Sequence, residues 1–224
     1  MKGKLIVLEG LDGSGKATQA QMLYEALCEQ GIQARKVTFP DYDHPSSTLI
    51  KQYLAGDFGK KPEDVNAYAA SSFFSVDRYA SYKTQWGAFY ENGGVVVADR
   101  YTTSNAVHQC AKLPMECWND YLAWLFDFEY DKIAIPAPDM VIYLDVAPEV
   151  SQQLMTGRYH GDETKKDIHE KDVDYLRHSR QAGTYCADKY GWQRVPCTEN
   201  GAMRTRQAIH ADVLRLTQTV LTEV

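Results

Sequence analysis

The chain has 224 residues, of which 44% are hydrophobic, and its formal net charge at pH 7 is −6. This length suits one folded domain spanning 1–224, and the acidic balance argues against binding to a nucleic-acid polymer. The chain has no apolar run of about 18 residues, so no membrane-spanning helix is expected. The five cysteines are scattered and form no Cys-x-x-Cys pair, which is typical of reduced thiols in a cytoplasmic protein.

Apolar runs of β type recur along the chain, with helical patterns between them, at 4–9, 33–39, 94–98, 140–146 and 192–197. This alternation predicts an α/β fold in which helices flank a parallel five-stranded sheet. The runs at 94–98 and 140–146 are almost continuously apolar, as expected for strands that are covered on both faces. Ligands of such sheets bind beyond the carboxyl ends of the strands, so the segments that follow each strand hold the candidate site.

The segment after the first strand is the most informative one, because it reads Gly-Leu-Asp-Gly-Ser-Gly-Lys and precedes a helix. In a P-loop of this kind the backbone N–H groups and the helix N-terminus form a cradle for polyphosphate, and the lysine reaches the β and γ phosphates. We predict that nucleotide phosphate is bound by Gly10, Asp12, Gly13, Ser14, Gly15, Lys16, Ala17 and Thr18. The motif departs from the usual pattern at Ala17, where a hydroxyl normally faces Mg²⁺, and Thr18 is the nearest hydroxyl.

Two apolar strands end in a carboxylate, which is the form that holds Mg²⁺ in many P-loop proteins. These carboxylates are Asp99 and Asp145, and Asp99 is preferred because Arg100 adjoins it, whereas no basic residue adjoins Asp145. Asp145 fits a cap of the helix that follows it. Arg100 is expected to grip a phosphate through two hydrogen bonds. The alternative is a buried ion pair with Asp99, and both can hold at once.

The segment from about 157 to 170 is polar and charged, and we expect it to be a mobile lid. It contains Arg158, Lys165 and Lys166.

The chain resembles the thymidylate kinases, which phosphorylate dTMP to dTDP. The resemblance rests on the P-loop, on Phe39-Pro40 and Tyr53-Leu54, on Phe74 with Asp77-Arg78, and on the run from Asp99-Arg100-Tyr101 to Ser104-Asn105-Ala106. It implies a P-loop nucleoside-monophosphate kinase fold, ATP and dTMP as substrates, Mg²⁺ as cofactor, and a homodimer. The aromatic-rich helix expected at 64–90 is a candidate for the dimer interface.

The resemblance also implies roles for individual residues. The catalytic residues would be Lys16, Asp99, Arg100 and Arg158, and Mg²⁺ would be held by Asp99 and Thr18. The dTMP pocket would be lined by Asp12, Tyr42, Phe74, Arg78, Arg100, Asn105 and His108. Phe74 and Arg78 are four residues apart and therefore share a helix face, where they offer a ring surface and a donor to a 4-oxo pyrimidine. The amino group of cytosine would meet that donor unfavourably. From its spacing alone, Phe74 would be interpreted as a core residue.

Three departures from the family pattern concern specificity and catalysis. His108 stands where a Tyr or Phe usually excludes a ribose 2′-hydroxyl, and Asp41 stands where many members have an arginine. Gly13 leaves the P-loop without a second cation, so Arg158 of the lid is expected to supply one. Two other functions stay open: a deoxynucleoside kinase with Asp41 or Asp43 as its base, and a nucleotide-binding regulator without catalysis, which only Ala17 favours.

Overall fold

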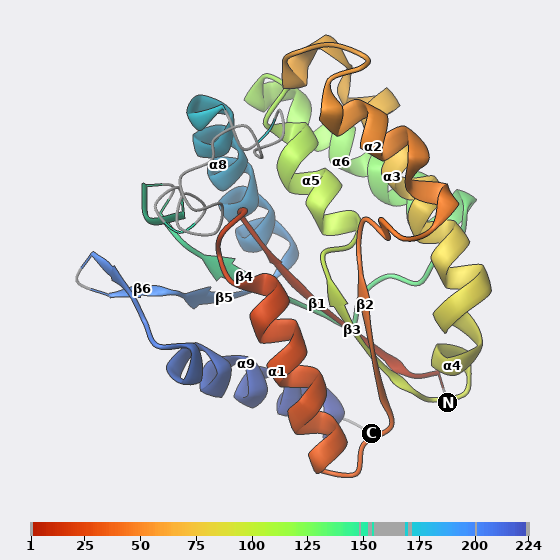
Figure 1. The fold of residues 1–224 in the computed structure, drawn as a ribbon, viewed down its shortest axis with the longest axis vertical. Coiled ribbons are helices and arrows are strands. Elements are labelled where there is room, and N and C mark those ends of the chain that lie inside the picture. The colour runs from red at the N-terminus through yellow and green to blue at the C-terminus, as the bar shows by residue number, and fades with distance from the viewer. Residues whose placement is uncertain are drawn as a thin grey trace.

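The computed structural model describes residues 2–147, 149–151, 154, 169, 172–199 and 201–222. Its centre is a parallel sheet of five strands in the order β2-β3-β1-β4-β5, with helices on both faces (Figure 1). The predicted fold class is therefore confirmed. In the register of the central strands, Leu8 of β1 lies opposite Asp99 of β3, and Glu9 lies opposite Tyr143 of β4.

The strands lie within about two residues of the predicted runs. They are β1 (Lys4–Gly10), β2 (Ala34–Thr38), β3 (Val95–Asp99), β4 (Met140–Asp145) and β5 (Gln193–Pro196), and a small antiparallel hairpin follows with β6 (Thr198–Glu199) and β7 (Ala202–Met203). The α-helices are α1 (Lys16–Glu29), α2 (Thr48–Ala55), α3 (Ala67–Ser81), α4 (Gly87–Glu91), α5 (Thr102–Cys110), α6 (Trp118–Phe126), α8 (Val173–Tyr190) and α9 (Arg206–Leu221).

The helical region predicted at 64–90 begins later than expected and changes its pitch. Residues Pro62–Asp64 form a separate 3₁₀ turn, α3 starts at Ala67, and the π-helix Tyr82–Trp86 joins α3 to α4. A second π-helix, Asp127–Lys132, extends α6. A π-helix has more residues per turn than an α-helix, so each of these segments shifts the face that the following residues present.

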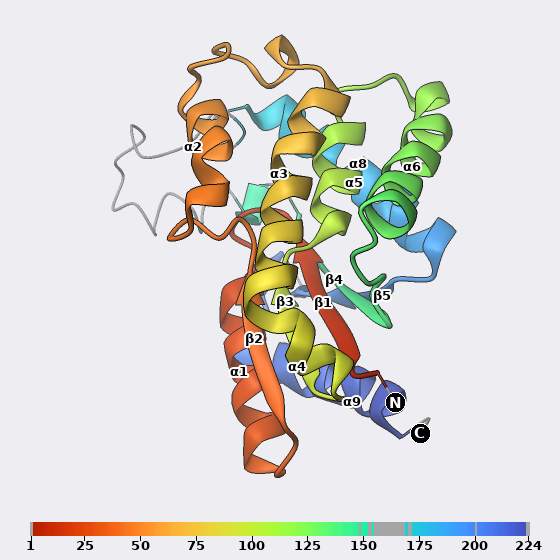
Figure 2. The ribbon, with the colours of Figure 1, turned by 90° about the vertical axis from the view of Figure 1, so that its right-hand side faces the viewer.

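Alternate residues of β1 supply two separate cores, one on each face of the sheet. Leu5 and Val7 pack with residues of α3 to α6 and α8, whereas Ile6 and Leu8 pack with α1 and α9. Figures 1 and 2 show this division, with α1 and α9 on one face and α3, α5, α6 and α8 on the other. Burial on both faces explains the continuous apolar run of this strand.

Within the described residues, no helix is both long enough and apolar enough to cross a membrane.

Candidate functional site

The loop between β1 and α1 has the backbone that a phosphate cradle requires. Gly10, Gly13 and Gly15 have φ values of 149°, 79° and 89°, which residues with a side chain rarely adopt. A Cβ added at Gly10 would lie 2.7 Å from the carbonyl oxygen of Leu144. The sequence therefore needs glycine here both for the turn and for the close approach of β4.

Lys16 is a buried cation at the end of this loop. Its Nζ donates to the carbonyl oxygen of Leu11 at 2.7 Å and lies 3.9 Å from the carboxylate of Asp12. Burial lowers the pKa of Lys16 to about 8, and the nearby Arg100 also lowers it. The hydrogen-bond acceptor of the ammonium is thus the neutral carbonyl of Leu11. A charged phosphate oxygen that takes its place would form the stronger hydrogen bond.

Arg100 occupies a backbone conformation that is unusual for a residue with a side chain. It follows β3 directly, its φ is 69°, and its backbone N–H donates to the carbonyl oxygen of Leu8 at 3.0 Å. Left-handed backbone at a non-glycine residue costs about 1–3 kcal/mol and is concentrated at functional sites. The conformation turns the side chain back over the carboxyl ends of β1 and β3, where ligands of α/β sheets bind.

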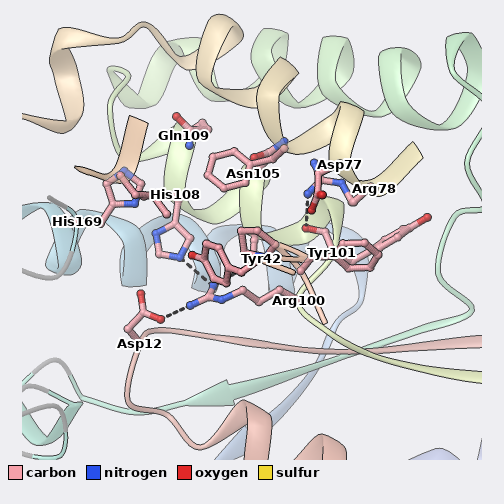
Figure 3. Close-up of a pocket in the computed structure, with 15 residues that line it drawn as sticks. Asp12, Tyr42, Asp77, Arg78, Arg100, Tyr101, Asn105, His108, Gln109 and His169 are labelled. Carbon is pink, nitrogen blue, oxygen red and sulfur yellow. Dashed lines mark hydrogen bonds and ion pairs between the residues drawn. The ribbon is translucent and has the colours of Figure 1, made fainter. Parts of the chain in front are cut away.

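The guanidinium of Arg100 is surrounded by acceptors. It pairs with Asp12, donates to Ser104 Oγ at 3.0 Å and to His108 Nε2 at 3.2 Å, and lies 3.6 Å from Glu9 Oε1. Dashed lines in Figure 3 mark its contacts with Asp12 and His108. Arg100 therefore links the P-loop, through Asp12, to α5, which carries Ser104 and His108.

Three carboxylates gather beside these two cations. Asp99 at the end of β3 is buried, and this burial raises its pKa although Lys16 and Arg100 oppose the shift. Burial would also raise the pKa of Asp12, but Arg100 and Lys16 outweigh it and hold that pKa well below its usual range. The predicted alternative, an ion pair between Arg100 and Asp99, is wrong, because the ion-pair partners of Arg100 are Asp12 and Glu9.

Asp99 also has the better chemistry for a hard cation such as Mg²⁺. The competing carboxylate, Asp145, is held by Arg180 at 3.1 Å and by Arg194 at 2.9 Å, so within the described residues it already has two ion-pair partners. Thr18 is half-buried in the first turn of α1. The described residues contain no complete cluster of metal-binding side chains.

A pocket of about 90 Å³ opens beyond Arg100, between α3 and α5 (Figure 3). Its lining comprises Asp12, Phe39, Pro40, Tyr42, Leu54, Phe74, Asp77, Arg78, Arg100, Tyr101, Ser104, Asn105, His108, Gln109 and His169. The structure thus brings all seven residues of the predicted acceptor pocket into one cavity. Arg158, Lys165 and Lys166 lie outside the described residues, as does the predicted lid from 157 to 170 except for His169.

One wall of the pocket comes from α3. Phe74 is half-buried and meets the ring of Tyr53 edge-on, with ring centroids 6.2 Å apart. Arg78 lies one turn further along and is almost fully buried, and its guanidinium forms an ion pair with the buried Glu129. Arg78 is therefore at the predicted place, but as half of an ion pair rather than as an unpaired cation.

The loop after β2 forms the entrance side of the pocket and is tied to α3. Asp77 accepts from the backbone N–H of Asp41 at 2.8 Å and from Ser46 Oγ at 2.5 Å. The side chain of Asp41 in turn accepts from Gln85 at 2.6 Å. Tyr42, which is 49% exposed, is thereby carried over the pocket, where Figure 3 shows it beside Arg100.

Two stacked histidines close the opposite side. The rings of His108 and His169 are 5.8 Å apart and within 12° of parallel. Burial and the adjacent Arg100 lower the pKa of His108 to about 3, so its ring is neutral at pH 7 and can accept from Arg100 through Nε2. Behind this pair, Tyr53 contacts His169 Nε2 at 2.7 Å, and Lys112 donates to the Tyr53 hydroxyl at 2.7 Å.

The structure places three residues in or behind the site to which the sequence pattern assigned no role: Asp77, which enters only as part of the family pattern, and Glu129 and Gln109, which belong to no motif. Glu129 lies four residues after the buried Leu125 on the inner stripe of the helix, where an acidic residue is unexpected, and this was the available signal. Gln109 lies one turn beyond Asn105 and is fully buried, and neither polar atom of its amide has a hydrogen-bond partner in the described part of the chain. A buried amide in this state lacks the partners that such groups normally have.

Comparison with known proteins gives a consistent result. The chain matches the family model described as thymidylate kinase over residues 8–200. The thymidylate kinase of Mycobacterium tuberculosis (strain ATCC 25618 / H37Rv) is 30% identical over 172 residues, which are 76% of this chain and 79% of that protein. The thymidylate kinase of Danio rerio is 26% identical over 220 residues, which are 98% of this chain and 92% of that protein.

Among solved structures, that of thymidylate kinase from Candida albicans covers 97% of this chain and 92% of its own with a TM-score of 0.71. Its sequence identity to this chain is 22%, so this similarity shows the shared fold.

Proposed function

The chain belongs to the thymidylate kinase family, so its reaction is the ATP-dependent phosphorylation of dTMP to dTDP, and we propose that the residues around Arg100 carry it out. The observation that supports this assignment best is the position of Arg100. It lies between the P-loop, where the donor phosphates would bind, and the pocket between α3 and α5, where the acceptor would bind. A guanidinium at this junction can contact the acceptor phosphate as the γ-phosphoryl group approaches.

The donor half of the site is the P-loop with Lys16. The backbone N–H groups of Gly13, Ser14, Gly15 and Lys16 would bind the ATP phosphates, and the Lys16 ammonium would exchange the Leu11 carbonyl for phosphate oxygens. We propose that Asp99, with Thr18, holds Mg²⁺, which supplies Lewis-acid charge neutralisation when it is bound.

The acceptor phosphate is the nucleophile, and no general base is required because its oxygens are already anionic near neutral pH. Catalysis is then the alignment of two phosphates and the stabilisation of charge by Lys16 and Arg100. Arg158 is proposed as a further cation, from the sequence alone, since it lies outside the described residues.

The acceptor half of the site is built for a pyrimidine. Phe74 of α3 offers a ring face, and polar groups come from Arg78 of α3 and from Asn105 and Gln109 of α5. The unpartnered amide of Gln109 has both a donor and an acceptor, which is the combination that the edge of thymine requires. The stacked His108 ring is proposed to pack against the sugar, in the place of the Tyr or Phe of other members.

Turnover measurements test the proposal against the two alternatives. Purified protein is incubated with ATP, Mg²⁺ and either dTMP or thymidine, and the nucleotide product is identified by chromatography. We expect dTDP from dTMP and no dTMP from thymidine. A deoxynucleoside kinase would give the reverse result, and it would need a base in the pocket, whereas neither Asp41 nor Asp43 is among its lining residues. A regulator without catalysis would give neither product.

We further propose a homodimer, and we infer one kinase domain over 1–224 and a cytoplasmic location. The support for the dimer is the outer face of α3, where Tyr68, Val76 and Tyr79 are 43%, 57% and 40% exposed. These positions fall within one stripe of the helix, and large exposed apolar patches are typical of interaction surfaces. Sedimentation equilibrium would give twice the monomer mass, and Val76→Asp would shift it to the monomer.

A further inference from the structure

Glu129 is a fully buried carboxylate that connects the two helices lining the base end of the pocket. It lies in the π-helix Asp127–Lys132. Its Oε2 accepts from Arg78 Nε at 2.7 Å, and its Oε1 accepts from Arg78 Nη2 at 2.5 Å. A two-point contact of this kind fixes the plane of the guanidinium as well as its position. The orientation of Arg78 in the pocket is therefore determined by Glu129.

The same carboxylate orients the amide of Asn105. Asn105 Nδ2 donates to Glu129 Oε1 at 3.1 Å and to the carbonyl oxygen of Ser71 at 3.2 Å. These two bonds use both hydrogens of the amide nitrogen. Turning the amide over would place its Oδ1 against two acceptors, one of them charged. The Nδ2 end is thus held toward Glu129, and Oδ1 is the opposite, accepting end.

Arg78 keeps only part of its donor capacity. A third hydrogen bond runs from Nη1 to the carbonyl oxygen of Tyr101 at 3.3 Å, as Figure 3 shows. A guanidinium has five N–H groups, so the three bonds leave one on Nη1 and one on Nη2. Both residues line the pocket, so Arg78 keeps a donor and Asn105 an acceptor whose orientations are fixed by Glu129.

This order of donor and acceptor distinguishes two kinds of pyrimidine. A 4-oxo pyrimidine presents an accepting O4 beside a donating N3–H, which matches the donor of Arg78 and the Oδ1 of Asn105. A 4-amino pyrimidine presents a donating amino group beside an accepting N3, so both positions would be mismatched. A site that leaves buried polar groups unpaired rejects a ligand strongly.

We propose that Glu129 is a positioning residue that sets the base specificity of the pocket, by fixing the donor of Arg78 and the carbonyl oxygen of Asn105 in the order that a 4-oxo pyrimidine requires. Glu129 is absent from the lining residues of the pocket, so it acts through these two neighbours. The inference rests on the proposed function, because it takes a pyrimidine monophosphate as the occupant of the pocket.

The Glu129→Gln variant tests this role at constant size. It exchanges one accepting oxygen for an NH₂ donor, so that Arg78 loses one of its two acceptors whichever oxygen is exchanged. Where the exchanged oxygen is Oε1, Asn105 loses its acceptor too and its amide is free to turn over. We expect the ratio of kcat/KM for dTMP to that for dCMP to fall by about tenfold or more, chiefly through the KM for dTMP. The KM for ATP should change by less than about twofold, because uniform binding at the P-loop is unaffected.

Ser75→Ala is the matched control. Ser75 Oγ donates to Glu129 Oε1 at 2.8 Å, but Ser75 is absent from the pocket lining. This variant removes one hydrogen bond of the same carboxylate, so it should lower the melting temperature and leave the dTMP to dCMP ratio unchanged. If Ser75→Ala changed the dTMP to dCMP ratio as much as Glu129→Gln does, the ratio would depend on the packing around the carboxylate in general. That result would overturn the proposal.

A second measurement separates base recognition from general damage. Calorimetric binding of 2-deoxyribose 5-phosphate, which has no base, should be equal in the wild type and in Glu129→Gln. An unchanged dTMP to dCMP ratio in that variant would overturn the inference, as would an equal loss for dTMP, dCMP and the base-free sugar phosphate. If Glu129→Gln does not fold, Glu129→Asp decides: a lower ratio supports the role and an unchanged ratio refutes it.

The wild-type data keep this test separate from that of the function. A wild type that does not phosphorylate dTMP with ATP would refute the proposed function and, with it, the premise of the inference. If the wild type phosphorylates dTMP but the Glu129 variants keep its dTMP to dCMP ratio, the inference is refuted and the proposed function stands.

Discussion

Replacing Arg78 by Met is expected to destabilise the fold severely, although the volume of the side chain is roughly kept. Glu129 is fully buried and would lose both charge-assisted bonds from the guanidinium, at 2.7 and 2.5 Å. Its other partners in the described structure are neutral donors, on Ser75, Thr102 and Asn105. Removing one partner of a buried ion pair costs about 3–5 kcal/mol, because the other charge is left without compensation.

For a chain of this length, each kcal/mol corresponds to about 2–4 °C, so the melting temperature should fall by about 6–20 °C. Differential scanning calorimetry at one protein concentration measures this, since a dimer would make the temperature concentration-dependent. In the double variant Arg78→Met/Glu129→Gln the uncompensated charge is absent, and at least half of the loss should be recovered. Two outcomes would refute the buried pair as a coupled unit. In one, Arg78→Met melts within about 2 °C of the wild type; in the other, the double variant loses as much melting temperature as the two single variants together.

The remaining predictions concern the phosphate end of the site. Lys16→Ala should abolish turnover and preserve the far-ultraviolet circular dichroism spectrum, and near-wild-type turnover would contradict the P-loop assignment. Because burial brings the pKa of Lys16 to about 8, kcat/KM for ATP should fall as the pH rises through 8 and the ammonium loses its proton, and a flat profile to pH 10 would argue against a role for this charge. Arg158→Ala should lower kcat by about tenfold or more with little change in either KM, as expected for a cation that acts in the transition state; an unchanged kcat would move attention to Lys165 or Lys166. Ala17→Ser should keep or improve activity and lower the Mg²⁺ concentration needed for half-maximal activity; a loss of activity would contradict a metal-facing position for residue 17, since Ala17 is exposed and a serine there meets no packing constraint.

The arrangement of the sheet was predictable because it depends on a pattern that spans many residues. Each strand is a run of apolar side chains, and β1 and β3 are buried on both faces, so their runs are continuous. The π-helices were not predictable, because an extra residue in a helical turn leaves no regular signal in the sequence. One of these π-helices, Asp127–Lys132, carries the buried Glu129. From the regular pattern of α6, an apolar residue would have been expected at this buried position.

It was easier to predict which residues line the site than which residues they pair with. The expected acceptor residues do line one cavity, because each lies at a strand end or on a recognisable helix face. Their partners lie far away in the chain: Glu129 is 51 residues from Arg78, and Asp12 is 88 residues from Arg100. No local pattern relates such positions. The sequence therefore offered only the adjacent Asp99 as an alternative partner for Arg100, whereas the fold brings Asp12 and Glu9 to it.

The charges that the described residues bring to the junction of the two half-sites support the proposal that catalysis uses cations beyond Lys16 and Arg100. Lys16 and Arg100 face Glu9, Asp12 and Asp99, so the described side chains sum to a formal charge of −1 before any phosphate is bound. ATP and a nucleoside monophosphate together add several negative charges to the same small volume, where burial weakens the screening by water. Neutralisation must then come with the substrates or from another part of the chain. Mg²⁺ bound with ATP would meet the first need, and a cation such as Arg158 would meet the second. The ion pair between Arg100 and Asp12 would open when the acceptor phosphate competes for the guanidinium, so this cation would be released to phosphate when the acceptor nucleotide binds.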